Sequence, residues 1–510
     1  MAAFKTFAVA LNGLDGHLIE VEAAVTSQLP GMVIIGLPDT ALSEAKQRIK
    51  VACHHSGIKL APRFITLNLS PAELPKNGSG FDLAMAVVAT AASGHLNHKS
   101  ISRAVHIGEL GLDGQVRRTR GVLPAILAAK KTGLSTVLVP SSCLAEAQLV
   151  KGIQIVPVAT LGEAVAWHRG DFAPHLQQIV EHNTPRTEAE EDMSDVVGNE
   201  EAIYALTVAA VGAHHVSMIG PPGTGKSMLA RRLPSILPDL DEKDAVEVTS
   251  LASVSSSKAI AGLIRRPPIQ SPHHSITPAA MVGSGSRRFA PGVISLASRG
   301  VLFLDEAPEF RTAALETLRQ PLEDGSISLR RANLHIEMPA KFLLIMASNP
   351  CPCGFAGSMK KSCTCRGSDL VRYRNRLSGP LLDRVDVHLD IERVAQIWRP
   401  LMADDEKGVQ GSAAIRARVA GARQRTKKRL RGTPWSSNGE VAGSWLRHPS
   451  NIPNPAVMAP IDNAFSKAQL NMRGVDRTLR VAWSLADLEH LPRPSKTNVL
   501  MALKLRIGES

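Results

Sequence analysis

The residues best suited to chemistry in this 510-residue chain form a glycine-rich segment that is typical of phosphate binding. Glycines let backbone N–H groups turn towards phosphate oxygens, a lysine places its charge on the β and γ oxygens, and a hydroxyl can bind Mg²⁺. All three features occur here at the required spacing. The expected cofactor-binding residues are Gly220, Pro221, Pro222, Gly223, Thr224, Gly225, Lys226 and Ser227. The segment predicts a nucleoside triphosphate site, with ATP and Mg²⁺ as cofactors.

Two carboxylates follow an apolar strand about 75 residues later, in the range expected of a nucleotide-binding domain. We expect Asp305 to hold Mg²⁺ together with Ser227, and Glu306 to orient and polarise the attacking water. Asn349 ends a second apolar strand, which should lie beside the first in the sheet. Its amide is therefore a candidate for positioning the same water.

Phosphoryl transfer also needs a cation at the developing charge, which a neighbouring subunit can supply. Arg384 is the candidate for such a finger, and the alternative is a surface arginine paired with Asp383 or Asp386. Arg473 and Arg477 lie one helical turn apart and could reach the γ-phosphate from a C-terminal lid. The alternative for this second pair is a solvated helix face.

Four of the six cysteines cluster with the spacing C-x-C-x9-C-x-C. The clustered residues are Cys351, Cys353, Cys363 and Cys365. In a reducing compartment this pattern indicates metal ligation, and four thiolates suit a structural Zn²⁺. Free cytosolic thiols are the alternative. Cys53 and Cys143 are isolated and read as ordinary buried thiols.

The composition is that of a globular protein of several domains, with 44% hydrophobic residues and a net charge of +13. The positive charge favours a polyanionic partner, nucleic acid first and a membrane surface second. The sequence contains neither an apolar run of membrane-spanning length nor a basic-then-apolar leader. We therefore expect a cytoplasmic protein without a membrane partner.

Strand and helix signals divide the chain into two α/β domains and a helical C-terminal domain. A proline-containing acidic stretch between the first two reads as a linker. The expected division is 1–168, linker 169–194, 195–393 and 394–510. Expected strands include 31–36, 64–69, 136–139, 216–219, 342–349 and 385–391, and expected helices include 39–57 and 226–233.

Several uncommon stretches resemble the magnesium-chelatase-like AAA+ ATPases, and more narrowly the YifB/ComM family. Beside the phosphate loop and the two carboxylates, the stretches are 271–275, 281–285, 349–354 and 373–384. The resemblance covers nearly the whole chain. It implies an N-terminal Lon-protease-like (ribosomal S5-type) α/β domain, a central AAA+ P-loop domain and a C-terminal helical lid.

The resemblance also implies a mechanism. Family members form rings, usually hexamers, with ATP sites between subunits, and Asn349, Arg384 and Arg473 would be sensor 1, the finger acting in trans and sensor 2. For the ComM branch it implies a DNA translocase that promotes branch migration during recombination or natural transformation. The alternatives are a chelatase-type motor that inserts a metal with partner subunits, and an ATP-dependent scaffold or chaperone without motor activity.

Two basic segments are candidates for contacts with single-stranded and branched DNA. Arg330 and Arg331 lie near the tip of an expected hairpin, 327–336, and Arg287 and Arg288 lie in a Gly/Ser-rich loop. In related ATPases such elements project into the central pore, where cations can track phosphates. A solvated hairpin charge is the alternative.

The N-terminal domain departs from a Lon-type peptidase at both positions of the Ser–Lys dyad. The nucleophile position falls on Gly80, with Ser79 one residue early, and the lysine position falls on Leu123. Because a dyad needs both partners within hydrogen-bond reach, we expect no peptidase activity. Oligomerisation or DNA contact is the expected role.

Residues 411–431 carry eight Lys or Arg and no acidic residue. A solvated helix face is the expected interpretation, and contact with a phosphate backbone is the second.

Overall fold

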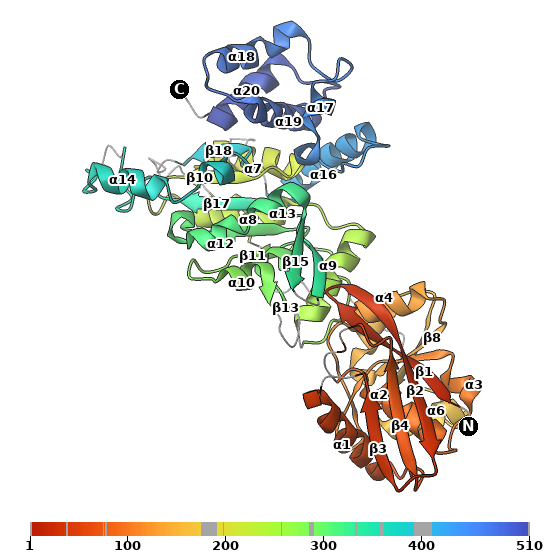
Figure 1. Ribbon diagram of the computed structural model, residues 1–510. Helices are drawn as coiled ribbons and strands as arrows, with labels where there is room; N and C mark the ends of the chain where they lie inside the picture. Colours follow the sequence, from red (N-terminus) through yellow and green to blue (C-terminus); the bar gives the residue numbers. More distant parts are fainter. Residues whose placement is uncertain are drawn as a thin grey trace.

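The computed structural model describes residues 3–36, 39–74, 76, 79–174, 191–196, 198–256, 258–284, 290–331, 334–357, 362–391 and 411–507; the side chains of 39–43, 331 and 334 lie outside this description. Three bodies follow one another along the molecule in chain order (Figure 1). The N-terminal body stands apart at one end, and the helical C-terminal body packs closely against the middle one.

The N-terminal body is built on a mixed sheet of seven strands in the order β3-β4-β2-β1-β5-β8-β9. The strands β1 and β2 form a long antiparallel hairpin and β2 pairs antiparallel with β4, whereas the remaining neighbours are parallel. Their bounds are Phe4–Asn12 (β1), Asp15–Thr26 (β2), Gly31–Ile35 (β3), Phe64–Ser70 (β4), Ala104–His106 (β5), Thr136–Pro140 (β8) and Gln154–Val158 (β9).

Helix α2 (Asp82–Ala92) packs on this sheet, and ten of its eleven residues are buried because its sequence is almost wholly apolar. Shorter elements complete the body. They are α1 Asp39–His55, α3 His98–Ile101, β6 Glu109–Leu110, β7 Val116–Arg117, α4 Val122–Lys131, η1 Ser141–Cys143, α5 Leu144–Ala147 and α6 Leu161–Arg169. Helix α6 ends one residue beyond the expected domain boundary.

The middle body contains a parallel sheet of five strands in the order β11-β14-β17-β10-β18. Every residue of β14 and β17 is buried, as expected of central strands with both faces covered. The strands are β10 Val216–Ile219, β11 Ile269–Gln270, β14 Val301–Leu304, β17 Leu343–Ser348 and β18 Val387–Asp390. The carboxyl ends of β14, β17 and β10 therefore lie side by side, which brings the predicted chemical residues together.

The helices and short strands around this sheet carry the loops of the site. The longer ones are α7 Glu200–Gly212, α8 Lys226–Ile236 and α9 Glu242–Ser255. The shorter ones are η2 Met193–Asp195, α10 Pro278–Val282, β12 Gly283–Ser284, β13 Ala290–Pro291, α11 Val293–Leu296, η3 Ala307–Glu309, α12 Thr312–Glu316, α13 Arg319–Asp324, β15 Ser326–Arg331, β16 Leu334–Pro339, α14 Gly367–Arg374 and α15 Gly379–Leu382.

The C-terminal body is helical, as the sequence predicts, and shares one apolar core with α7, α8 and the sheet. Helix α19 lies at its centre, with twelve buried residues. The elements are α16 Ser412–Arg429, η4 Asn438–Glu440, α17 Gly443–Leu446, α18 Pro455–Ser466, α19 Met472–Leu488 and α20 Lys496–Ile507.

The basic helix α16 is only in part the solvated face that its sequence suggests. Arg423 is half-buried and donates to the carbonyl oxygen of Ala210, with N···O distances of 2.9 and 2.6 Å. Arg429 pairs with the buried carboxylate of Asp487 and lies 4.3 Å from the ring centre of Trp483. Arg423 thus ties α16 to α7, and Arg429 ties it to α19 within the C-terminal body. Four other basic residues of the segment, Arg418, Lys427, Lys428 and Arg431, are exposed, as expected of a solvated face.

Glu146 joins the N-terminal body to the middle one. It is 1% exposed and accepts hydrogen bonds from Arg118, from the backbone N–H of Leu123 and from the hydroxyl of Ser253 in α9. Helix α4 packs on α9 beside this contact. In the described part of the chain, no helix is both long and apolar enough to cross a membrane.

Candidate nucleotide site and cysteine cluster

The glycine-rich loop connects β10 directly to α8, the context that a phosphate loop requires. Gly223 and Gly225 have φ values of +77° and +89°, which glycine adopts without strain. Gly220 is needed for another reason, since a Cβ there would lie 2.3 Å from the carbonyl oxygen of Ile391. The loop conformation is thus encoded by its glycines.

Lys226 and Asn349 meet at the end of the sheet, as the order of the strands predicts. The Nζ of Lys226 lies 3.3 Å from Oδ1 of Asn349, and donates to the carbonyl oxygens of Gly220 and Pro221 at 2.6 and 2.8 Å. Burial lowers the pKa of Lys226. The ammonium is therefore held by the loop at the position where β and γ oxygens would bind.

The magnesium ligands expected from the sequence also lie together. The Ser227 hydroxyl donates to Oδ2 of Asp305 at 2.7 Å, and Oδ1 of Asp305 accepts from the backbone N–H of Glu306 at 3.0 Å. A hydroxyl and a carboxylate are hard oxygen ligands that fit Mg²⁺. Glu306 is exposed and adopts a left-handed φ of +52°, a strained backbone of the kind found at functional sites. Its carboxylate is free to meet a water at the phosphate.

Arg384 does not pair with Asp383 or Asp386. It is 9% exposed, pairs with Glu323 of α13 and donates to the carbonyl oxygen of Pro380 at 2.6 Å. Within a single chain, the guanidinium is thus held by the half-exposed carboxylate of Glu323. To reach a phosphate on a neighbouring subunit, Arg384 would have to leave Glu323.

The two lid arginines have different environments. Arg473 is exposed and forms no hydrogen bond or ion pair with any described residue. Arg477 is not on a solvated face and is not free to close over a phosphate, because it donates to Oδ1 of buried Asp386 at 2.5 Å. Asp386 also accepts from the backbone N–H of His215 at 3.2 Å and lies 3.4 Å from Nδ1 of His214. This buried cluster was not apparent from sequence, since its members lie far apart along the chain.

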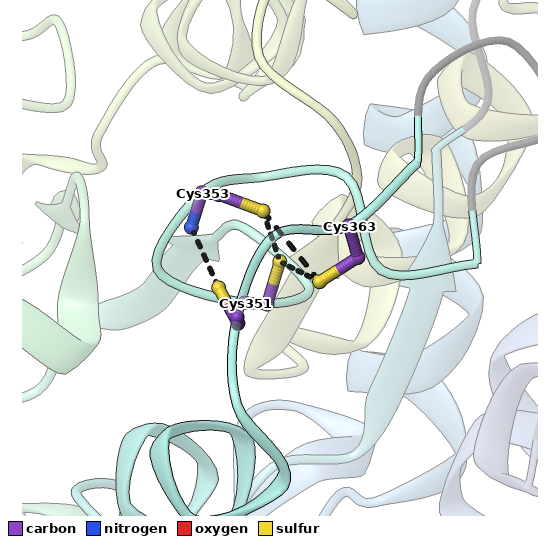
Figure 2. Close-up of side chains that lie close together, drawn as sticks. Cys351, Cys353 and Cys363 are labelled. Atoms are coloured by element: carbon purple, nitrogen blue, oxygen red, sulfur yellow. Dashed lines mark hydrogen bonds between the residues drawn. The ribbon is translucent and has the colours of Figure 1, made fainter.

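The four clustered cysteines converge on one point, and their sulfur atoms all lie within 4.8 Å of one another. Figure 2 shows three of them facing each other across the loop, with Sγ–Sγ distances of 3.3 Å (351–353), 3.8 Å (351–363) and 3.6 Å (353–363). A tetrahedral site with Zn–S bonds of about 2.3 Å separates its sulfurs by about 3.8 Å. Backbone N–H groups of Thr364 and Phe355 lower the pKa of Cys353 to about 5, whereas burial and the neighbouring thiols raise the pKa of Cys365 to about 12. The donor set therefore fits Zn²⁺.

The cysteine loop packs against the phosphate loop, a contact that sequence reasoning missed. Gly354 has a φ of +83°, and a Cβ there would lie 2.6 Å from Cδ of Pro222. Cys351 follows Asn349 by two residues, so the same segment carries the amide that contacts Lys226. The cluster is therefore placed to support the nucleotide site mechanically.

The predicted DNA-contacting residues are only partly described. The hairpin is confirmed as β15 and β16, and Arg330 is exposed on it, opposite His335. The side chain of Arg331 and both Arg287 and Arg288 lie outside the described residues. Asn12, the last residue of β1, donates to the carbonyl oxygen of His335 at 2.9 Å, so the N-terminal body contacts this hairpin.

The two positions of a Lon-type Ser–Lys dyad carry no such dyad in this chain. Ser79 donates its hydroxyl to Glu109, and Leu123 is a buried residue at the start of α4. Gly80 offers no side chain. The serine is therefore paired with a carboxylate and not with a lysine.

All three bodies match protein families that describe the same subunit of magnesium chelatase. Residues 192–397 match the family described as magnesium chelatase, subunit ChlI. Residues 21–143 match subunit ChlI of Mg-chelatase, and residues 409–506 match the C-terminal family of the same subunit. Together with the geometry above, these matches define a magnesium-chelatase-type AAA ATPase domain, which implies ATP hydrolysis with Mg²⁺.

Near-full-length relatives narrow this class. The chain is 45% identical to an uncharacterized protein of Mycobacterium tuberculosis over 99% of both chains. It is 34% identical to Competence protein ComM of Haemophilus influenzae over 96% of this chain and 94% of that protein, and 35% identical to the uncharacterized protein YifB of Escherichia coli over 94% and 92%. The chain belongs to the YifB/ComM family of magnesium-chelatase-like proteins.

Proposed function

We propose that this chain is an ATP-driven, ring-shaped DNA translocase that promotes branch migration during recombination or natural transformation. The observation that carries the proposal is the near-full-length similarity to Competence protein ComM. The net charge of +13 and the exposed Arg330 on a hairpin of the ATPase body support a nucleic acid partner. Arg331, Arg287 and Arg288 would extend the same DNA contact.

The assembly we propose is a hexamer with each ATP held between two subunits. Arg384 would act on the neighbour's γ-phosphate, while Arg473 closes from the lid of the same subunit. Met228 on the helix after the phosphate loop is 43% exposed, and Val371 on α14 is 60% exposed, which supports burial of these faces by another copy. An isolated subunit would then hydrolyse ATP poorly.

The cysteine cluster would hold a structural Zn²⁺ through Cys351, Cys353, Cys363 and Cys365. When bound, the ion would supply a rigid link between the two ends of the loop. The N-terminal body would be a Lon-protease-like domain without peptidase activity, serving oligomerisation or DNA contact. We propose that the protein acts on DNA in the cytoplasm.

A chelatase-type motor is the second candidate, because the chain is 29% identical to the magnesium-chelatase 38 kDa subunit of Rhodobacter capsulatus. That similarity covers 31% of this chain and 49% of that protein, whereas the ComM similarity covers nearly all of both. The longer match favours the DNA translocase.

Strand displacement on three- and four-stranded DNA tests the proposal. The wild-type protein should displace a strand in the presence of ATP, with ATP hydrolysis stimulated by DNA. Lys226→Ala and Glu306→Gln should both abolish displacement. Wild-type protein that hydrolyses ATP without stimulation by DNA, and that moves no strand, would refute the helicase function and leave the chelatase-type motor as the better candidate.

A further inference from the structure

A basic cavity of about 720 Å³ lies on the N-terminal body, in a part of the chain to which the ATPase mechanism assigns no role. It is formed by α3, the start of β8 and the end of α6, which lie on the same side of that body in Figure 1. Its size is within the range of ligand pockets. Among the described residues that line it, none is acidic. The charged side chains that line the cavity are therefore all positive.

Three cations supply this charge. Lys99 and Arg103 are exposed, and their side chains form no hydrogen bond or ion pair within the described ranges. Arg169 uses its Nε to donate to the carbonyl oxygen of His95 at 3.2 Å, which orients the guanidinium. Since no carboxylate of the cavity neutralises these groups, an anion can do so.

The back of the cavity is fixed by a chain of hydrogen bonds. Thr6 Oγ1 lies 2.9 Å from Nδ1 of His106, the Nε2 atoms of His106 and His168 are 2.8 Å apart, and Nδ1 of His168 lies 2.8 Å from the Ser100 hydroxyl. Burial lowers the pKa of His168 to about 4 and holds that of His106 well below its usual range, so both are neutral at pH 7. Ser100, which lines the cavity, is thus held in place by an uncharged wall.

Trp167 adds a second kind of recognition. Its indole lines the cavity and meets the ring of His168 edge-on, with centroids 4.8 Å apart and planes at 75°. Hydroxyls of Ser135 and Thr136 lie on another side of the same space. Cations and hydroxyls bind phosphates, and an indole stacks on a base irrespective of its identity. One nucleotide unit offers both groups.

We propose that this cavity binds the phosphate backbone of single-stranded DNA, with Lys99, Arg103 and Arg169 at the phosphates and Trp167 as a stacking surface. The choice of DNA over another phosphate ligand rests on the proposed function. The N-terminal body would thus bind the DNA strand at a site separate from the hairpin that carries Arg330.

The test is fluorescence anisotropy of a labelled 20-residue oligothymidylate on the full-length protein at several salt concentrations. Lys99→Ala/Arg103→Ala is compared with Lys50→Ala/Lys131→Ala, which removes the same charge from exposed positions of the same body outside the cavity. Each phosphate contact on a single strand contributes about 0.7 to the slope of log K against log salt. The cavity variant should therefore lose about 1.4 of that slope and about 10-fold or more in affinity, and the control should lose neither.

Trp167→Leu should weaken binding by about 5-fold or more without changing the slope, and Trp167→Phe should restore it. Equal effects of the two double variants, or a wild type that does not bind the oligonucleotide, would overturn the proposal. Thymidine monophosphate and inorganic phosphate are run in parallel. If only these small anions lose binding in the cavity variant, the site takes a free phosphate ligand and the DNA assignment is wrong.

Strand displacement is measured separately on the same proteins. Wild type that binds the oligonucleotide through the cavity but moves no strand would refute the motor and leave this binding site intact.

Discussion

Arg477 in the lid helix α19 donates to Asp386, two residues after Arg384, at an N···O distance of 2.5 Å. Asp386 is 2% exposed, and its pKa lies well below the ordinary value because Arg477 and His214 outweigh the effect of burial. The contact joins the C-terminal helix α19 to the segment that carries Arg384.

Arg477→Met should destabilise the packing of the lid by about 3–5 kcal/mol, because it leaves a buried carboxylate without its cation. The matched control is Arg473→Met, one turn away, where the exposed side chain has no partner among the described residues. Hydrogen exchange of the α19 amides measures both. Comparable exchange in the two variants would show that the ion pair does not hold helix α19 in place. Adding Asp386→Asn to Arg477→Met removes the unpaired buried charge and should recover part of the lost stability.

Glu306→Gln should bind ATP with nearly wild-type affinity and lower kcat by about 10²- to 10⁴-fold, since it removes the group that polarises the water. Lys226→Ala should instead weaken nucleotide binding itself, because it removes the cation held at the phosphate position. Equilibrium binding of a fluorescent ATP analogue and steady-state hydrolysis separate the two effects. A Glu306→Gln protein that turns over ATP at the wild-type rate would assign the water to another residue.

Metal analysis of the purified protein should find about one zinc per chain, since four sulfur ligands complete a tetrahedral site. Cys353→Ser should lower that content, while Cys53→Ser, at a buried cysteine outside the cluster, should leave it unchanged. Preparations without zinc would identify the cluster as free thiols.

Gly354→Ala should weaken nucleotide binding, because the new Cβ would meet Pro222 of the phosphate loop. Gly357→Ala is the control: Gly357 also has a positive φ, of +77°, but no described atom lies within 4 Å of the position of its Cβ. Both variants carry a backbone cost of about 1 kcal/mol, and only the first disturbs the loop. Equal nucleotide affinities, measured by titration calorimetry, would show that the cysteine loop does not shape the site.

Acid should destabilise the N-terminal body through its buried histidines. The pKa of His168 is lowered by burial from 6.5 to about 4, so the unfolded chain binds more protons between these values. The stabilisation is complete above about pH 6.5 and is lost as the pH falls towards 4, at about 1.4 kcal/mol per unit. His168→Gln should reduce this pH dependence in urea unfolding followed by tryptophan fluorescence. An unchanged dependence would place the titration elsewhere.

Local chemistry could be predicted from the sequence because neighbouring residues alone specify it. The phosphate loop needs glycines next to a lysine and a hydroxyl, and its strand and helix lie immediately before and after it. The two apolar strands ending at Asp305 and Asn349 are also local signals, and a parallel sheet brings their ends together. The cysteine spacing likewise confined four sulfurs to one short loop. In contrast, the long hairpin β1–β2 was not predicted. Buried positions alternate along both strands, but in β1 apolar residues also occupy the partly exposed positions, which hides the alternation in the sequence.

The sequence by itself determined that this chain has a phosphate loop with magnesium and water-positioning residues, and that its family is that of YifB and ComM. The tertiary structure decided which arginine side chains are free to bind a ligand and which are engaged by other residues of the protein. Arg477 and Arg423 look like Arg473 in the sequence, yet the first two are half-buried and bonded to Asp386 and to the Ala210 carbonyl, whereas Arg473 is exposed. A charge is free or engaged according to partners that lie tens to hundreds of residues away, and only the packing of the bodies brings those partners into contact.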